Sequence, residues 1–498
     1  WKYNEENSAF EHNRHFYSDS AYYFIRVDDT DAMRLEEMPF PDGPITSETI
    51  KFLDRQFIEN DIVNLAKSGR EFFGEIFDIA PLTIQYSFPF TNLLAEEARI
   101  DASVVARSMS VASDFDLLSF DQTLNLSPTY TSDGTTANVA NIATSSMNLV
   151  PNAGNSFSAQ LTFTKAVPDA TGWLDYLRVN AWRGLQQNGA QMHFRNPSFI
   201  ADGGVTRFLI GSASQIRAVW DVTDPVNVRR MQVSPIDGDP ANLEMIAESN
   251  ELHEYISFSD FNYLTPKPNG RVENQNLHSM NDVDMVILSS PLFLTAAEEL
   301  MEIHSAEGLE IKIVTPRQVY NEFSSGNPDV TAIKMMMKML YDRADGNPDL
   351  RPKYLQIIGD GTFMNKLSSD NSSYVITYQS GNSISPTSSY VSDDYYAFLD
   401  DSTSEALGDA MDIGVGRIPC EDLEQAKGYV NKVKRYLSGN TSSDGGAYCL
   451  GDQEGSPYGS WRNIICLVSD DMDGNGGPTE SIHMSNSKEE HWHNFHLS

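Results

Sequence analysis

Cysteine is scarce in this sequence. Cys420, Cys449 and Cys466 are its only three, an odd and small number that excludes a disulfide framework, so packed cores must hold the fold together. Long apolar runs are missing too: no run of about 18 apolar residues and no signal-peptide pattern occurs, which argues against a membrane span. The sequence begins with Trp1 rather than Met, and we therefore expect it to begin inside a longer protein.

Positive charge is also in short supply. Lys and Arg together number 35 against 70 Asp and Glu, which gives a formal net charge of -35. A surface of this sign repels nucleic acid and anionic membranes and argues against both as partners. The composition predicts an acidic soluble protein that meets other proteins or cations.

The 498 residues are enough for roughly three domains at about 150 residues each. Residues 1–263 form a β-rich, sandwich-like region, which we expect to divide into two subdomains. Short apolar runs at 22–25, 82–84, 158–163 and 208–210 are separated there by turn-forming residues. One helix is expected at 52–68, because its apolar residues recur near a 3.6-residue period before Gly69.

A linker is predicted at 264–281, where Pro266, Pro268 and Gly270 disfavour both helix and central strand. An α/β domain follows at 282–498. Strands at 284–288, 309–314 and 355–358 alternate with helices at 291–305 and 330–344, which is a βαβαβ order and predicts a largely parallel sheet. Since ligands and catalytic groups of such sheets gather at the carboxyl ends of the strands, we expect the site near Gly359-Asp360-Gly361.

Six motifs follow one another along the chain and carry a resemblance. They are Tyr-Ser-Asp at 17–19, Ser-Gly-Arg-Glu at 68–71, Val-Glu-Asn-Gln-Asn-Leu-His at 272–278, Ile-Gly-Asp-Gly at 358–361, Ser-Asp-Asp-Tyr at 392–395 and Ile-Gly-Val-Gly-Arg at 413–417. In this order the chain resembles the gingipain-type (C25) cysteine peptidases, and within them the sortase-like component of the type IX secretion system. The resemblance implies an α+β multidomain protein in which a caspase-like α/β domain follows the β-rich region.

Peptidases of this family use a cysteine thiolate, a histidine that activates it and an acid that orients the histidine. Asp393 matches the position of that acid, although Asp394 could match it instead, and an acidic loop residue that solvates a turn is the alternative to both. The family's histidine follows a glycine, and no Gly-His pair occurs in the sequence.

The remaining candidates for the dyad fit poorly. His483, His491, His493 and His496 lie in a polar tail, and none of the three cysteines has the basic surroundings of a nucleophile. We therefore expect the catalytic His and Cys to lie beyond this chain, and the chain as given to be inactive.

For the intact protein, the resemblance implies an endopeptidase and transpeptidase that removes C-terminal sorting domains from secreted cargo and joins the new end to a surface glycolipid. It implies cargo proteins and an outer-membrane β-barrel as partners, an extracytoplasmic location in the periplasm or at the outer-membrane surface, and no required cofactor.

A calcium site is possible at Asp471, Asp473 and Asn475, because alternating oxygen ligands around Gly474 can wrap a hard cation. The distant glutamate of an EF-hand loop is absent, and a plain acidic turn is the alternative. A weaker candidate lies at Asp400, Asp401 and Glu405.

Two other classes of function stay open. The first is a non-catalytic surface or assembly protein that uses the same fold to bind partners through its β-rich region. The second is a nucleotide-dependent flavodoxin-like enzyme, suggested by Gly359-x-Gly361 after a strand. Met364 replaces the third glycine of a dinucleotide fingerprint, so the nucleotide reading is the weaker of the two.

Overall fold

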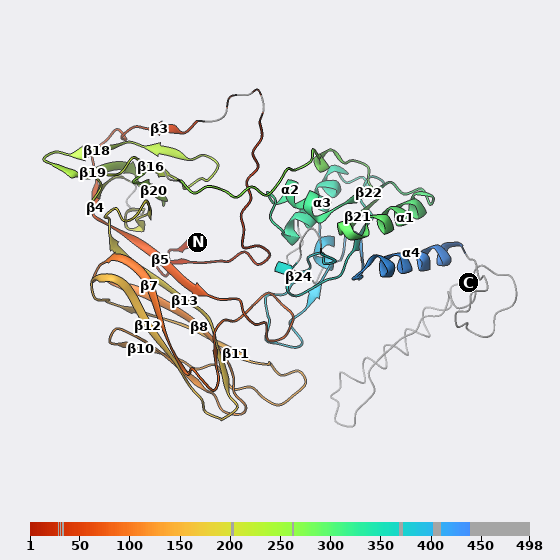
Figure 1. The fold of residues 1–498 in the computed structure, drawn as a ribbon, viewed down its shortest axis with the longest axis horizontal. Helices are drawn as coiled ribbons and strands as arrows, with labels where there is room; N and C mark the ends of the chain where they lie inside the picture. The colour runs from red at the N-terminus through yellow and green to blue at the C-terminus, as the bar shows by residue number, and fades with distance from the viewer. Residues whose placement is uncertain are drawn as a thin grey trace.

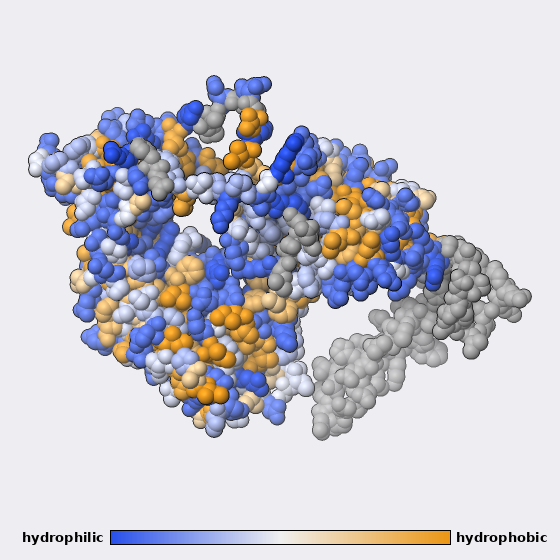
Figure 2. All heavy atoms as spheres, in the orientation of Figure 1, coloured by the Kyte–Doolittle hydropathy of each residue, from blue (hydrophilic) through white to orange (hydrophobic). Residues whose placement is uncertain are grey.

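The computed structural model describes residues 1–438 except 28, 30, 32–33, 201–203, 261–262, 368–371 and 402–409. It has a β-rich N-terminal part and a C-terminal part in which helices cover a parallel sheet (Figure 1), so the predicted fold class is confirmed. Hydrophilic residues cover most of the face shown in Figure 2, as the composition requires. Among the described residues no helix combines the length and the apolar character needed to cross a membrane.

The first β-sandwich is one sheet folded into two layers. Its strand order is β10-β9-β12-β7-β13-β8-β11, and β5 and β6 also pair with β13. Strands β7 and β13 meet at the single pair Leu93–Arg183, where the sheet bends. Phenylalanine rings from β7, β9 and β12 fill the space between the layers and pack against aliphatic residues of β8 and β13. The strands are β5 (Lys51–Glu59), β6 (Ile76–Phe77), β7 (Thr83–Leu93), β8 (Ala98–Arg107), β9 (Asp114–Ser119), β10 (Gln122–Leu126), β11 (Asn141–Leu149), β12 (Gly154–Thr164) and β13 (Thr171–Gly184).

Strand β5 corrects the prediction of a helix at 52–68, which is wrong. The segment pairs with β13 in antiparallel register from Lys51–Gly184 to Glu59–Tyr176. Phe52 and Leu53 are adjacent and both buried, as happens when a strand has a core on each face but not when a helix lies on one surface. The expected strand at 22–25 is wrong as well, since residues 21–27 form no regular element.

The second β-sandwich packs the sheet β14-β20-β16-β17-β3 on the sheet β18-β19-β15-β4. Phe194, Phe208, Met245 and Tyr255 lie in its core, together with Phe52 of β5, so the two sandwiches share a strand. The elements are β3 (Glu36–Met38), β4 (Ser47–Thr49), β14 (Gln191–Phe194), η1 (Pro197–Phe199), β15 (Val205–Ile210), β16 (Ala218–Asp221), β17 (Arg229–Met231), β18 (Val233–Ile236), β19 (Asp239–Glu248) and β20 (Tyr255–Phe258); the short pair β1 (Lys2–Asn4) and β2 (Ala9–Glu11) precedes them.

The C-terminal part is a three-layer α/β domain. As far as the structure describes it, the parallel sheet has the order β22-β21-β23-β26. Helices α2 and α3 cover one face and α1 and α4 the other (Figure 1), and successive residues of β21 face the two cores in turn. The elements are η2 (Leu277–Ser279), β21 (Met285–Ser289), η3 (Pro291–Phe293), α1 (Leu294–Ser305), β22 (Ile311–Val314), α2 (Pro316–Phe323), α3 (Val330–Arg343), β23 (Tyr354–Ile358), η4 (Asn365–Leu367), β24 (Tyr378–Gln379), β25 (Val391–Ser392), η5 (Asp394–Ala397), β26 (Gly414–Ile418) and α4 (Leu423–Ser438).

Local signals set the helices of this domain. Thr315 and Gln318 form a capping box at the start of α2, and the Asp329 side chain accepts a hydrogen bond from the amide of Thr331 at the start of α3. Strand β21 is buried at every residue because helices cover both faces of the sheet there. The predicted βαβαβ order is confirmed over residues 285–358.

Candidate functional site

The carboxyl edge of the parallel sheet is where the candidate site residues gather. Strand β23 ends at Ile358 and turns through Gly359 into Asp360. Gly359 has φ +146, and a Cβ there would lie 2.8 Å from both the Ser373 carbonyl oxygen and Val375 Cγ2. Only glycine permits this close approach. The returning chain then passes directly over the end of the strand, where Val375 N donates to the Asp360 carbonyl oxygen at 2.9 Å.

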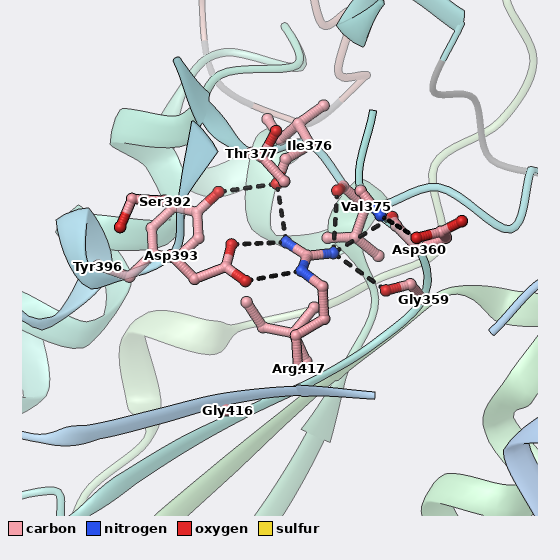
Figure 3. Close-up of polar contacts among 12 residues, drawn as sticks. Gly359, Asp360, Val375, Ile376, Thr377, Ser392, Asp393, Tyr396, Gly416 and Arg417 are labelled. Atoms are coloured by element: carbon pink, nitrogen blue, oxygen red, sulfur yellow. Dashed lines mark hydrogen bonds and ion pairs between the residues drawn. The ribbon is translucent and has the colours of Figure 1, made fainter. Parts of the chain in front are cut away.

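Arg417 of β26 connects the parts of this edge (Figure 3). Its Nε donates to Asp393 Oδ2 and its Nη2 to Asp393 Oδ1, both at 2.7 Å, which is a bidentate charge-assisted pair. Nη1 donates to the carbonyl oxygens of Gly359, Asp360 and Val375 at 3.1, 3.2 and 3.1 Å, and Nη2 to that of Ile376 at 3.4 Å. One guanidinium therefore holds Asp393, the end of β23 and the returning chain in a fixed arrangement.

The ion pair lies largely out of solvent. The Arg417 side chain is 11% exposed and that of Asp393 20%. Burial by itself lowers the pKa of Arg417, but the hydrogen bonds and negative charge of Asp393 outweigh it, so the pKa ends above its usual value and the guanidinium stays charged. Tyr396 lies alongside, fully buried; burial raises its pKa well above the usual value, and its hydroxyl donates to the Ile376 carbonyl oxygen at 2.8 Å.

Asp393 is better placed than Asp394 to take part in chemistry at this edge. Asp394 is exposed in the first turn of η5, whereas Asp393 is half-buried against Arg417. Among the described residues, the Asp393 carboxylate accepts hydrogen bonds from Arg417 and from no histidine. Each carboxylate oxygen can accept a second bond, so the role of Asp393 as the acid that orients a histidine stays a prediction.

Cys420 lies just past the end of β26, in the core between the sheet, α1 and α4. Burial, helped by the negative charges of Asp360 and Asp422, raises the pKa of its thiol to about 11. A thiol in this state holds its proton near neutral pH and is a poor nucleophile. Cys449, Cys466, His483, His491, His493 and His496 lie outside the described residues.

The metal candidates are not brought together by anything that the structure describes. Asp471, Asp473 and Asn475 lie outside the described residues, as does Glu405, and Asp401 pairs with Lys338 at 2.7 Å. Within the described ranges no group of three His, Cys, Asp or Glu side chains could hold a metal ion. The calcium site stays a prediction.

With the geometry of the edge established, the chain can be compared with known proteins. Residues 278–496 match the sequence profile of peptidase family C25. This region is therefore similar to peptidase family C25, and we call the α/β domain that carries the match the C25 domain. No curated protein matches the chain in sequence.

The fold resembles that of a solved protein, dimeric latent PorU from Porphyromonas gingivalis. The match has a TM-score of 0.70 at 22% identity and covers 81% of this chain and 39% of that one, so the present chain spans about two fifths of that relative. At this identity the likeness shows the fold alone. A further protease structure (TM-score 0.22, 17% identity, 31% and 28% covered) and the carbohydrate-binding module CBM35 of Cellvibrio japonicus Abf62 (TM-score 0.17, 13% identity, 26% and 97% covered) are too dissimilar to support an argument.

A cavity of about 240 Å³ lies where the β-rich region meets the C25 domain, beside the loop that follows β23. Phe16, Phe72 and Met364 give it apolar walls. Arg14 and Lys366 also line it, and each pairs there with Asp61, at 3.0 and 3.3 Å. The cavity therefore combines apolar walls with charged side chains beside the loop that follows β23.

Two residues of the C25 domain that organise the site carry no predicted role in the sequence analysis. Arg417 stands there only as part of a motif, although a lone arginine in a strand of glycines and aliphatic residues must find an anion or a set of carbonyl oxygens once the sheet buries it. Gln379 is fully buried at the end of β24, and the sequence holds no local signal for its role because its partners are distant.

Proposed function

We propose that this chain is the N-terminal and acid-bearing portion of a gingipain-like cysteine peptidase of the PorU type. The observation that carries the proposal is the position of Asp393, which Arg417 holds at the carboxyl edge of the parallel sheet in a C25 domain. Catalytic groups of open α/β sheets are found at this edge. The ordered motifs and the PorU-like fold support the same assignment.

In the proposed chemistry, a thiolate attacks the scissile carbonyl carbon, a C–S bond forms, and the C–N bond breaks as the histidine protonates the leaving amine. An amine or water then attacks the acyl-enzyme and releases the thiolate. Asp393 would accept a hydrogen bond from the histidine ring and hold its tautomer and orientation. Arg417 would keep the acid fixed while the charge on the imidazole changes.

The finer proposal follows from the motifs and from the likeness to PorU. The intact protein would remove C-terminal sorting domains from cargo of the type IX secretion system and transfer the cargo to the amine of a surface glycolipid. Such a protein would act outside the cytoplasm, in the periplasm or at the outer-membrane surface, beside an outer-membrane partner. The cavity between Phe16, Phe72 and Met364 would receive a cargo side chain.

The test uses the native full-length protein and a peptide-like probe that acylates cysteine. We expect the wild type to acquire the probe on one cysteine outside residues 1–498, located by mass spectrometry, and Asp393→Ala to label at least tenfold more slowly. Asp394→Ala is the matched control, because the neighbouring carboxylate is exposed and should leave labelling unchanged. Equal labelling of Asp393→Ala and wild type would show that Asp393 is not the orienting acid.

The second candidate is a non-catalytic binding module on the same fold. Both carboxylate oxygens of Asp393 already accept from Arg417, and a purely structural role for the pair would look the same. If the native protein acquires no probe on any cysteine, the binding module becomes the leading proposal.

A further inference from the structure

A loop of the β-rich region is inserted into the C25 domain near the candidate site. Gly69 N donates to the Gln379 side-chain oxygen at 3.1 Å, Arg70 N to the Ser380 carbonyl oxygen at 2.9 Å and Glu71 N to Ser383 Oγ at 2.8 Å. We call residues 66–71 the docking loop. It contacts the chain that joins β24 to β25, in the part of the C25 domain that faces the β-rich region (Figure 1).

The docking loop is shaped for close approach. Gly69 has φ +78, and a Cβ there would overlap the Asn382 carbonyl oxygen and lie 2.5 Å from Ser383 Oγ. Backbone atoms cannot swing away as a flexible side chain can, so only glycine lets the two chains touch. Next to this contact Ile384 of the C25 domain packs into a small core with Phe73 and Trp173 of the β-rich region. The two regions therefore share a packed hydrophobic interface at this contact.

The Gln379 side chain connects the docking loop to the interior of the C25 domain. Its Oε1 accepts from Gly69 N, and its Nε2 donates to Thr377 Oγ1 at 2.8 Å and to the Thr362 carbonyl oxygen at 3.3 Å. Thr362 belongs to the loop that follows the Gly359 turn at the end of β23. One fully buried amide thus connects the docking loop to the carboxyl edge of the sheet, and its hydrogen bonds are strong because no water competes for them.

From Gln379 the contact continues to Asp393. Strand β24 pairs with β25 through Tyr378–Ser392 and Gln379–Val391, so the residues directly before Asp393 are held by the strand that carries Gln379. On the other side of Asp393, the ring of Tyr395 stacks on that of Tyr378 with centroids 4.7 Å apart. The backbone on both sides of Asp393 is therefore held by β24.

We propose that the docking loop is a positioning element of the candidate site: by holding Gln379, it keeps β24, β25 and Asp393 in the arrangement that pairs with Arg417. The β-rich region would then complete the site as well as bind partners, and anything that pulls the loop away would loosen Asp393. A role for this coupling in catalysis rests on the proposed function. The coupling between the docking loop and Asp393 can itself be measured without catalysis.

The experiment compares Gly69→Ala with Gly189→Ala by hydrogen exchange and mass spectrometry on the full chain. Both glycines have left-handed backbones, at φ +78 and +70, but a Cβ at Gly189 would have no atom within 4 Å. Both variants therefore pay a similar backbone strain, and only one meets a clash. We expect Gly69→Ala to speed exchange at residues 375–397 about tenfold or more, with α1 unchanged, and Gly189→Ala to leave residues 375–397 as in the wild type.

Two results would overturn the proposal. One is faster exchange in residues 64–73 of Gly69→Ala with residues 375–397 unchanged, which would show that the loop moves without affecting Asp393. The other is no change in either segment. If Gly69→Ala does not fold, Ser383→Ala removes the acceptor of Glu71 N and should give the same pattern with a smaller increase; an unchanged 375–397 segment there would overturn it too. Faster exchange in Gly69→Ala would support the coupling even if the acylating probe labels no cysteine of the native protein. The test of the coupling and the test of the proposed function can therefore fail independently.

Discussion

Replacing Arg417 by lysine should loosen the carboxyl edge of the sheet while keeping its charge. Within the described residues the guanidinium donates twice to Asp393 and also to the carbonyl oxygens of Gly359, Asp360, Val375 and Ile376. A lysine ammonium has three donors at one point and cannot reproduce a planar fork. Some of these buried acceptors would lose their partner.

The magnitude follows from what is left unpaired. Each buried acceptor without a partner costs about 1–3 kcal/mol, and removing one member of a buried ion pair costs about 3–5 kcal/mol. Because lysine keeps one charged contact to Asp393 and the loop can relax, we expect Arg417→Lys to lower the local stability by roughly 2–3 kcal/mol. Arg417→Ala should reach roughly 3–5 kcal/mol.

The assay is native-state hydrogen exchange at β23, β26 and residues 375–376. Global unfolding is unsuitable, because a chain of several domains does not unfold in two states. A loss of 2–3 kcal/mol corresponds to exchange roughly 30- to 150-fold faster. Arg107→Lys, at an exposed position that ends β8, is the control and should change nothing at these strands. Exchange in Arg417→Lys within threefold of the wild type, or full additivity of Arg417→Lys with Asp393→Asn, would refute the reasoning.

Three further predictions concern other parts of the chain. Burial raises the pKa of Asp175, in β13, to about 7. Because this lies above the unfolded value, the stability present at pH 4 is lost as the pH rises through 7, and native-state hydrogen exchange of β13 should show Asp175→Asn more stable than the wild type by on the order of 2–4 kcal/mol at pH 8 and equal to it at pH 4. Glu322 accepts from the amide and ring of His278 at 3.0 and 2.7 Å, so Glu322→Ala should speed proteolytic cleavage in 263–278 at least fivefold, whereas exposed Glu298→Ala should not; equal rates would contradict this role. The buried thiol of Cys420 should react with a disulfide reagent at pH 8 about 100-fold more slowly than free cysteine, because few of its molecules are thiolate; rapid labelling of native protein at this residue would contradict its burial.

The sequence predicts elements well where the signal is local. Each strand and helix of 285–358 buries one or two faces. The spacing of its apolar residues over about a dozen positions is enough to predict the element. Strand β5 was assigned wrongly because its apolar spacing near Phe52 also fits a helix. The segment is a strand and not a helix because it pairs with the distant strand β13, in which Gly184 lies opposite Lys51.

The candidate site, too, can be predicted from the sequence only where its signals are local. Asp393 and the Gly359 turn follow from motifs and from the end of an apolar strand. The Asp393–Arg417 pair does not, because the order of β23 and β26 in the sheet brings the two side chains together. The contact between Gly69 and Gln379 joins residues that are 310 positions apart in the sequence, so no local pattern predicts it.

The pairing of β3 and β4 has a consequence for how the protein is made. These short strands lie early in the chain, but β4 pairs in parallel with β15 at Thr206–Phe208, and β3 with β17 at Arg229–Met231. A ribosome that adds about 5–20 residues per second needs roughly 10–40 seconds to reach β17 after β3 has emerged. During that interval both early strands have open edges that another chain could pair with. Before that time the second sandwich cannot close, because its early strands still lack the partners that complete its two sheets.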